Sequence, residues 1–378
     1  MKEFILKEIL QSDIKEELDG IGFDKSYQSR AAEKFLYKNI KIFSLKPAQA
    51  NILKQTALSF GADCATHRQT IVGDIEFTDC ILGGSQAQLK KIADKLSFQP
   101  FSLKFLGEEI HKFIDLKRTS NPQIVGILNI TPNSFSDGGE FLEFDNAIEH
   151  LQAMIEQGAD IIDIGAESTK PFSQPVPDNE QLKRILPVLD YVKKSGLQTT
   201  ISIDTRSSRV ADECIKHGAA IINDVSGFDF DSAMPDVAAK HNVKIILQHS
   251  AGTPENMQKN PHYENLMDEI YLSLRAKKEL ALSRGIKQEN IILDPGIGFG
   301  KTRENNFEII RRVEEFYGLG CPIMLGLSRK SLLNIPEADN FTKDIYTVAL
   351  NTLAIERKVD FLRVHNVKLH KTLLEILR

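Results

Sequence analysis

The sequence lacks the features that indicate a disulfide scaffold, a zinc site or a membrane protein. Its four cysteines, at positions 64, 80, 214 and 321, are far apart and never in CxxC spacing, which argues against zinc and disulfide frameworks. We expect reduced, partly buried thiols. No apolar run reaches the roughly 18 residues that a membrane-spanning helix needs. Acidic residues interrupt the apolar start of the chain, so we expect no signal peptide and a cytoplasmic location.

An excess of positive charge is also missing. The formal net charge is −5 and the isoelectric point lies near 6.0, which gives no electrostatic basis for binding nucleic acid or an anionic membrane. Hydrophobic residues make up 42% of the 378 residues. This composition allows a substantial core, and the length is compatible with a barrel plus an appended domain. Both fit a soluble enzyme.

Two common phosphate-binding motifs are absent where they would be expected. No GxGxxG follows the first strand of the repeating region described below, which disfavours a dinucleotide-binding sheet. The stretch DPGIGFGKT, residues 294–302, has proline at position 295 where GxxxxGK[ST] requires glycine, so we expect no nucleoside triphosphate there. The stretch GLSRKS, residues 326–331, is a better anion site, through Arg329 or Lys330 and the N–H groups that open a helix.

From residue 123 onward, an apolar strand, a polar loop and a helix recur eight times. Strands rich in Ile and Val with helices between them indicate a parallel sheet covered on both faces. Eight such units over about 255 residues have the size of a (β/α)₈ TIM barrel; a doubly wound open sheet is the alternative. The helix expected over Asp145–Gln157, with Gly158 as its stop, is typical of these units. The predicted strands are Gln123–Ile130, Asp160–Gly165, Gln198–Ile203, Ala220–Asp224, Val243–Gln248, Asn290–Leu293, Pro322–Leu325 and Asp360–Val364.

Residues 1–118 are predicted to form a smaller α+β domain of unknown role, ahead of a barrel over residues 119–378. Asp79–Gly84 predicts a strand, and Ser85–Leu96 predicts a helix with Ser85 as its N-cap. A charge cluster and Ser-Asn-Pro within His111–Gln123 indicate the boundary. The first region shows no catalytic constellation.

Every predicted barrel strand ends in polar side chains. Because all βα loops of a TIM barrel open on one face, residues remote in the sequence converge there. Any one of them could cap a loop or stay solvated at the surface, but packing alone would not place polar side chains at the ends of eight strands. The polar ends are Asn129, Glu167, Thr169, Asp204, Asn223, Asp224, His249, Asp294, Lys330, Arg363 and His365.

These polar ends share a chemical character. The carboxylates and the amide of Asp204, Asn223 and Asp294 can pair with the N–H donors of a nitrogen heterocycle. The basic residues at the last two strands can hold anionic groups. Asn129, beside acidic loops, can ligate Mg²⁺ through oxygen. The sequence therefore predicts one site for an anionic heterocyclic ligand.

Seven motifs at these strand ends, in this order and spacing, resemble those of the dihydropteroate synthase family. The resemblance covers residues 123–378, about two-thirds of the chain. The region before Arg118 is similar to an N-terminal extension of some bacterial members. The motifs are GILNITPNSFSDGG (126–139), GAESTKP (165–171), SIDT (202–205), INDVSG (222–227), LDPGIGFGK (293–301), GLSRKS (326–331) and RVHNV (363–367).

The resemblance implies a TIM-barrel transferase of folate biosynthesis. Such an enzyme joins p-aminobenzoate to 6-hydroxymethyl-7,8-dihydropterin diphosphate and releases 7,8-dihydropteroate and pyrophosphate. The resemblance also implies Mg²⁺ as a cofactor, sulfonamides as competitors of p-aminobenzoate, and a homodimer through the late helices.

Roles for individual residues follow from the same resemblance. Asp204, Lys330 and Asp137 would support the catalytic step, and Asn129 would ligate Mg²⁺. The implied substrate-binding residues are Asn223 and Asp294 at the pterin, Arg363 and His365 at the diphosphate, and Thr169, Pro171, Phe135, Phe299 and Ser331 around p-aminobenzoate.

The chain departs from the usual family pattern at several positions, mainly in the first two loops. None of the departures removes a principal pterin, metal or diphosphate residue. They are Asn133 for Asp, Ala166 for Gly, Lys170 for Arg, Phe172 for Gly, the sequence QHSA at 248–251, and Asn366 for Asp.

Two other functions compete with the synthase. A corrinoid-dependent, pterin-binding methyltransferase shares the barrel but would not need TPNSFSDGG or RVHNV. A non-catalytic pterin-binding or interaction protein would be favoured if Asn129, Asp137 or Arg363 were missing, and all three are present.

Overall fold

The computed structural model describes residues 5–116, 121–130, 139–167, 175–251, 261–333, 335 and 337–377. The chain separates into two compact units, Met1–Lys117 and Arg118–Arg378. Each unit has a hydrophobic core of its own. No helix in the described part of the chain is long and apolar enough to cross a membrane.

The first unit packs three of its helices, within residues 47–115, on one face of a small antiparallel sheet, and the two shorter helices before residue 33 form a small cluster of their own. Buried and exposed residues alternate from Thr78 to Leu82 in one of the strands, so one face of the sheet belongs to the core. The strands are β1 (Tyr37–Leu45), β2 (Asp63–Thr66) and β3 (Thr78–Ser85), in the order β1-β3-β2; the helices are α1 (Ile14–Gly20), α2 (Gln28–Ala32), α3 (Pro47–Ser59), α4 (Gln86–Leu96) and α5 (Leu103–Asp115).

Ser85 determines where α4 begins. Its Oγ accepts the Gln88 N–H at 3.3 Å, and Gln88 Oε1 accepts the Ser85 N–H at 2.8 Å. This reciprocal pair is a capping box, which satisfies two N–H groups that the first turn leaves unpaired. The predicted cap and helix are confirmed.

All four cysteines are free and buried.

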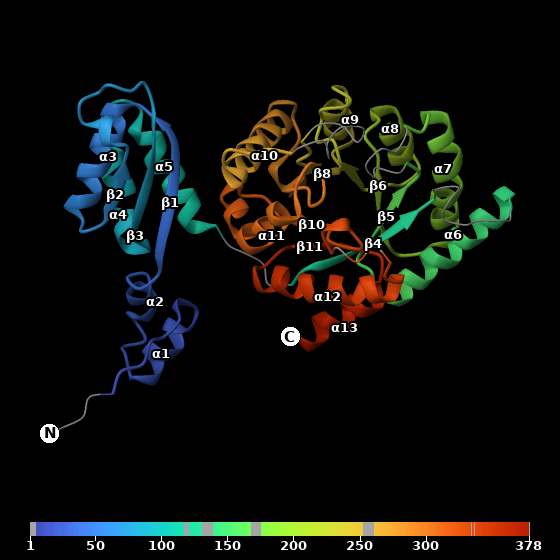
Figure 1. The fold of residues 1–378 in the computed structure, drawn as a ribbon, viewed down its shortest axis with the longest axis horizontal. Helices are drawn as coiled ribbons and strands as arrows, with labels where there is room; N and C mark the ends of the chain where they lie inside the picture. Colours follow the sequence, from blue (N-terminus) through green and yellow to red (C-terminus); the bar gives the residue numbers. More distant parts are fainter. Residues whose placement is uncertain are drawn as a thin grey trace. The chain divides into compact units, whose positions relative to one another are not determined.

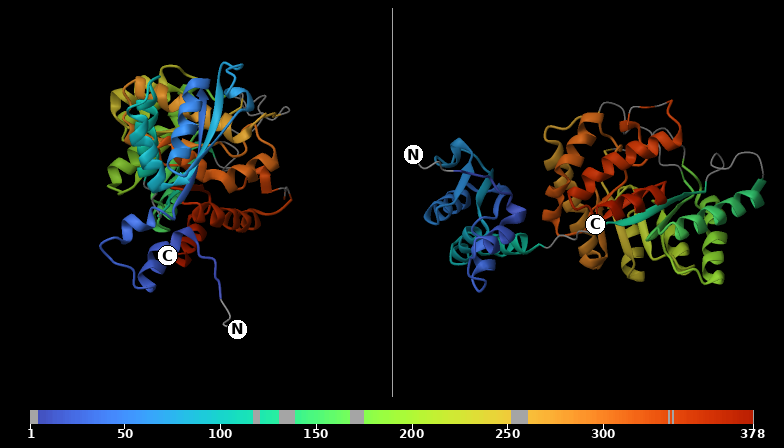
Figure 2. Two further views of the ribbon diagram at one scale, coloured as in Figure 1. Left: turned by 90° about the vertical axis from the view of Figure 1, so that its left-hand side faces the viewer. Right: turned by 90° about the horizontal axis from the view of Figure 1, so that it is seen from below.

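The second unit is a (β/α)₈ TIM barrel, as the sequence predicts. Parallel strands alternate with helices, and the helices lie outside the strands (Figures 1 and 2). Each strand begins and ends within two residues of its predicted bounds. The strands are β4 (Gln123–Asn129), β5 (Ile161–Gly165), β6 (Thr200–Asp204), β7 (Ile221–Asp224), β8 (Lys244–Gln248), β9 (Ile291–Asp294), β10 (Met324–Leu325) and β11 (Phe361–Val364). The helices are α6 (Gly139–Glu156), α7 (Asp178–Ser195), α8 (Ser208–Lys216), α9 (Met234–His241), α10 (Leu266–Ser283), α11 (Arg303–Arg312), α12 (Asn340–Glu356) and α13 (Val367–Ile376).

The sheet closes on itself. Its strand order is β10-β11-β4-β5-β6-β7-β8-β9, and the two ends meet at a parallel bridge between Leu293 and Ile323. There the Leu293 N–H donates to the Pro322 carbonyl oxygen at 2.9 Å. The alternative of an open, doubly wound sheet is therefore wrong. Helix α6 ends at Glu156, one residue before its predicted end, and Gly158 follows as the predicted stop, with a φ of +88° that suits glycine.

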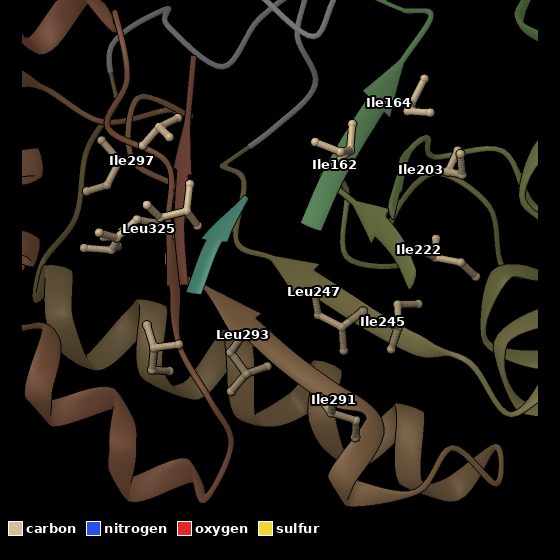
Figure 3. Packing of buried hydrophobic residues seen from close by; sticks show 14 of the residues in the cluster. Ile162, Ile164, Ile203, Ile222, Ile245, Leu247, Ile291, Leu293, Ile297 and Leu325 are labelled. Atoms are coloured by element: carbon tan, nitrogen blue, oxygen red, sulfur yellow. The ribbon is translucent and has the colours of Figure 1, made fainter. Parts of the chain in front are cut away.

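Alternate strand residues face the barrel interior and the surrounding helices. Side chains such as Ile162, Ile222 and Leu293 pack between strands and helices in the main core (Figure 3). A second cluster comes from seven of the eight strands and fills the amino-terminal half of the interior. Its members are Val125, Ile161, Ile221, Ile246, Ile292, Met324 and Phe361.

We predict that the barrel folds without the first unit. A chain beginning at Thr119 should keep a cooperative thermal transition, because a closed ring of strands needs no further strand to complete it. Differential scanning calorimetry of the shortened chain measures this, with the full chain as control. Loss of the cooperative transition, at temperatures where the full chain is folded, would contradict the prediction.

Candidate active site

A polar layer lies above the apolar layer of the barrel interior. The residues two positions beyond Ile161, Ile221, Ile292 and Phe361 point to the same side of their strands, because strand side chains alternate with a period of two. They are Asp163, Asn223, Asp294 and Arg363, and Asp204 on β6 pairs in register with Asn223. The four acidic and amide side chains of this set are at most 5% exposed. The barrel therefore gathers polar and charged groups from five strands at the end where its βα loops open.

Arg363 joins two of the carboxylates. Its Nε donates to Asp163 Oδ2 at 2.7 Å, and its Nη2 donates to Asp204 Oδ2 at 2.7 Å. Asp163 Oδ2 also accepts from Asn223 Nδ2 at 3.0 Å. We call these four residues, Asp163, Asp204, Asn223 and Arg363, the arginine cluster.

Three oxygens of the arginine cluster lack a donor. Oδ1 of Asp163, Oδ1 of Asp204 and Oδ1 of Asn223 are buried and accept no hydrogen bond from the residues that the structure describes. A buried acceptor without a partner costs about 1–3 kcal/mol, so three in one place are unusual for a packed interior. While the carboxylates are ionised, all three oxygens act only as hydrogen-bond acceptors, for N–H or O–H groups. The arrangement is suited to a ligand that presents several N–H donors.

Lys330 lies near Asp294 and Arg363, and both charges act on it. Its Nζ donates to the Ile297 carbonyl oxygen at 2.5 Å and lies 4.7 Å from the centre of the Phe299 ring. Asp294 Oδ1 accepts the Gly296 N–H at 2.7 Å. The adjacent Arg329 is engaged elsewhere, because it forms two bonds of 2.7 and 2.8 Å with Asp344.

The loop after β9 is held tightly against the end of β8. A side chain at Gly296, which has a φ of +72°, would place its Cβ 1.8 Å from the His249 carbonyl oxygen. Lys301 Nζ lies 2.9 Å from His249 Nδ1 and donates to the Phe299 carbonyl oxygen at 3.0 Å. Glycine and a buried lysine thus fix the position of the Phe299 backbone.

The charged groups of the site have strongly shifted pKa values. Burial raises the pKa of Asp204 to about 7, with Arg363 opposing the shift and neighbouring carboxylates adding to it. Burial also raises the pKa of Asp294. It lowers the pKa of Lys330 to about 8, against the attraction of Asp294, and that of Lys301 to about 7. Such clustered shifts are typical of functional sites.

Asn129 and His365 lie at the edges of this polar layer. A Cβ built on Gly165 would be 3.6 Å from Asn129 Oδ1 and 3.4 Å from the Asp204 Cβ, so glycine leaves room between Asn129 and Asp204. His365 Nδ1 lies 2.9 Å from Ser328 Oγ. Within the described ranges, no three His, Cys, Asp or Glu side chains are grouped as a metal site.

Three of the predicted strand-end residues make contacts that stabilise the fold. Asp224 accepts from the N–H groups of residues 226 and 228, which stabilises the turn after β7. Glu167 pairs with the buried Arg206 at 2.9 Å. His249 contacts Lys301 as described above, and burial lowers its pKa to about 2.

The structure brings together Asp204, Asn223, Asp294, Lys330, Phe299 and Arg363 from the set expected at the site. Several other residues of that set lie outside the described residues. They are Phe135, Asp137, Thr169 and Pro171, together with the side chain of Ser331.

Two buried residues of this region were not predicted from the sequence. Asp163 is a single carboxylate in an isoleucine-rich strand, and Lys301 follows a glycine-rich loop. The signal for Asp163 is its place in GADIID, which repeats at GAAIIND with Asn223 at the same polar end. That repeat would have assigned both residues to the interior.

Comparison with known sequences assigns the second unit to a family. The family described as "Pterin binding enzyme" matches residues 125–365. A dihydropteroate synthase of Clostridium beijerinckii is 43% identical over 248 residues, which cover 65% of this chain and 88% of that protein. A "bifunctional dihydropteroate synthase/dihydropteroate reductase" of Helicobacter pylori is 33% identical over 377 residues, 99% of this chain and 98% of the relative.

A third relative is longer than this chain. It is a "probable bifunctional folylpolyglutamate synthase/dihydropteroate synthase" of Haloferax volcanii, 34% identical over 343 residues. The match covers 84% of this chain but only 40% of that protein. The chain therefore spans less than half of this archaeal relative.

Solved structures agree with the sequences. A Clostridium difficile dihydropteroate synthase, determined in the presence of pteroic acid, superposes with a TM-score of 0.64 at 40% identity, and covers 69% of this chain and 96% of that one. A Xanthomonas albilineans enzyme with 4-aminobenzoic acid superposes with a TM-score of 0.63 at 32% identity, over 68% and 92% of the two chains. With a TIM barrel, a polar layer at its loop end and matching sequences throughout residues 125–365, this chain belongs to the pterin binding enzyme family.

Proposed function

We propose that this protein is a dihydropteroate synthase. It would condense 6-hydroxymethyl-7,8-dihydropterin diphosphate with p-aminobenzoate to give 7,8-dihydropteroate and pyrophosphate. The observation that carries the proposal is the arginine cluster: three buried acceptors without donors, next to a guanidinium, on a barrel similar to dihydropteroate synthases. A pterin presents several N–H donors, and its diphosphate supplies the anion.

The proposed reaction transfers the pterin's methylene carbon from oxygen to nitrogen. The bond from this carbon to the diphosphate oxygen breaks, and its electron pair leaves with pyrophosphate. The amine nitrogen of p-aminobenzoate bonds to the carbon and loses one proton. Asp204 would stabilise the positive charge that develops on the pterin, while Arg363 and His365 would hold the departing pyrophosphate. A cation beside Asp204 would favour its ionised form over the protonated form that burial favours.

The loops would form the p-aminobenzoate pocket. Phe299 is held beside Lys330 by the contacts described above, which supports its proposed place in the pocket wall. We assign the other pocket positions by family resemblance, and propose that loop closure excludes water. These positions are Phe135, Asp137, Thr169, Pro171 and Ser331.

Mg²⁺ is proposed as a cofactor shared with the substrate. The donors fit in part: Asn129 offers an exposed amide oxygen at the end of β4, a hard ligand of the kind that Mg²⁺ binds together with phosphates and water. When bound, the ion would neutralise charge on the leaving diphosphate. The protein's own contribution would be to hold one ligand near Gly165 and Asp204.

The role of the first unit is not indicated by the names of its relatives. The Helicobacter protein is named for a reductase as well as a synthase. The match to the Haloferax protein, however, covers more of this chain than the barrel alone contains, so it extends into the first unit. That relative is not named for a reductase. We therefore propose the synthase activity alone.

We predict that Asp204→Asn and Lys330→Ala each lower kcat by about a hundredfold or more, because each removes an electrostatic contact to the pterin. Product formation from pterin diphosphate and p-aminobenzoate measures this. Asp224→Asn is the matched control, since Asp224 is a buried strand-end carboxylate whose hydrogen bonds to the described residues all go to the turn after β7. Its kcat should stay within about threefold of the parent's. A near-normal rate for either site variant would refute that residue's role, and a parent protein without turnover would refute the proposed function.

Chelation should abolish turnover, and Mg²⁺ should restore it. Asn129→Ala should raise the Mg²⁺ concentration needed for half-maximal rate, because one of few protein oxygens is lost. Titration of Mg²⁺ into dialysed protein measures both effects. Full activity in EDTA would exclude the proposed role of the metal.

We also propose a homodimer through the late helices. Helix α12 carries four large exposed apolar side chains, Phe341, Ile345, Tyr346 and Leu353. Phe341 and Ile345 lie four residues apart and Tyr346 and Leu353 seven apart, so each pair shares a helical face. Light scattering should give twice the chain mass at micromolar concentration, and Ile345→Glu should shift the mass toward the monomer. A monomeric parent protein would contradict this proposal.

A further inference from the structure

Asp163 is the most completely buried charged group of the candidate site. It is 0% exposed and lies in the middle of β5, between Ile162 and Ile164, whose side chains face the helices. An isolated carboxylate in such a place would cost far more free energy than an apolar residue. The contacts of Asp163 must therefore explain why a carboxylate is found in this apolar strand.

Through one carboxylate oxygen, Asp163 contacts two residues that belong to different parts of the proposed substrate site. Asp163 Oδ2 accepts from Arg363 Nε at 2.7 Å and from Asn223 Nδ2 at 3.0 Å. The first partner belongs to the proposed diphosphate site and the second to the proposed pterin site. No other described carboxylate bonds to both.

The bond to Asn223 determines which way its amide faces. An asparagine amide has a donor end and an acceptor end. Because the donor end is occupied by Asp163 Oδ2, the acceptor oxygen Oδ1 is left without a donor among the described residues. Asn223 is thereby fixed as an acceptor for a ligand N–H.

The bond between Asp163 and Arg363 uses only the Nε of the guanidinium, so the other N–H groups of Arg363 can bind other partners. Nε is occupied by Asp163, while Nη2 reaches Asp204 at 2.7 Å. A guanidinium has five N–H donors in a fixed plane. Anchoring Nε and Nη2 therefore fixes the plane of the guanidinium and with it the orientation of the remaining donors.

We propose that Asp163 is a positioning residue that holds the pterin-binding Asn223 and the diphosphate-binding Arg363 at once. This inference rests on the proposed function. It makes a specific claim that a purely structural role would not: loss of the Asp163 charge must weaken recognition of both halves of the substrate, whereas loss of either partner must weaken mainly one.

The test is isothermal calorimetry with two separate probes, 6-hydroxymethylpterin and inorganic pyrophosphate with Mg²⁺. Asp163→Asn should raise the Kd of each probe about tenfold. Asn223→Ala should raise mainly that of the pterin, and Arg363→Met mainly that of pyrophosphate. Asp160→Asn is the matched control: Asp160 lies one residue before the start of the same strand, where its carboxylate accepts from the Ile124 N–H and from Lys371 Nζ. It should change neither Kd by more than about twofold.

A folded Asp163→Asn protein that binds both probes like the parent would overturn the inference, even if its thermal stability were lower. If Asp163→Asn does not fold, Asp163→Glu keeps the charge but displaces it by one methylene, and the same tenfold losses are expected. Unchanged Kd values in that variant would overturn the inference equally. A parent protein that binds neither probe would instead contradict the proposed function.

Discussion

The buried contact between Arg363 and two carboxylates is the interaction on which the candidate site depends. A guanidinium with bonds of 2.7 Å to both Asp163 and Asp204 offsets negative charge that the barrel interior could not otherwise contain. Removing one partner from a buried ion pair typically costs about 3–5 kcal/mol, since the other charge is left uncompensated. The carboxylates still outnumber the cation, which is one reason why the pKa of Asp204 rises to about 7. The site therefore retains unfavourable electrostatic energy, which a bound ligand with N–H donors would reduce.

The barrel makes this concentration of charge sustainable. The apolar layer of Val125, Ile161 and their neighbours closes the lower interior, so the polar groups are confined to one end. Parallel register then places Asp204 beside Asn223 and opposite Gly165. The strands supply rigid positions, and the loop after β9 packs against β8 closely enough that Gly296 admits no side chain. Rigid supports of this kind hold catalytic groups more precisely than loops alone.

Much of this arrangement could be predicted from the sequence, because it depends on local patterns. Apolar strands with polar ends located all eight strands, and the same ends supplied Asp204, Asn223, Asp294, Lys330 and Arg363. The prediction treated every strand end alike, however. It could not separate Asp224, which turns to the backbone of its own loop, from Asn223, which faces the interior, since one residue reverses the direction of a strand side chain.

Asp163 shows the limit of such reasoning most clearly. Its role depends on Arg363, 200 residues further along the chain, and on the closure that places β11 beside β4 and β4 beside β5. Sequence spacing carries no record of that closure. Lys301 is similar, because its partner His249 comes from a different strand end, 52 residues away. Contacts of this kind appear only once the ring of strands is complete.

The central claim is that the unpartnered acceptors of the arginine cluster bind a pterin. A crystal structure of the protein with 6-hydroxymethylpterin diphosphate tests this claim most directly. We predict that N–H groups of the heterocycle lie within hydrogen-bonding distance of Asp204 Oδ1 and Asn223 Oδ1, two of the three oxygens of the cluster that lack donors. We also predict that the diphosphate lies against Arg363. A heterocycle bound elsewhere, with those oxygens still unpartnered, would contradict the account.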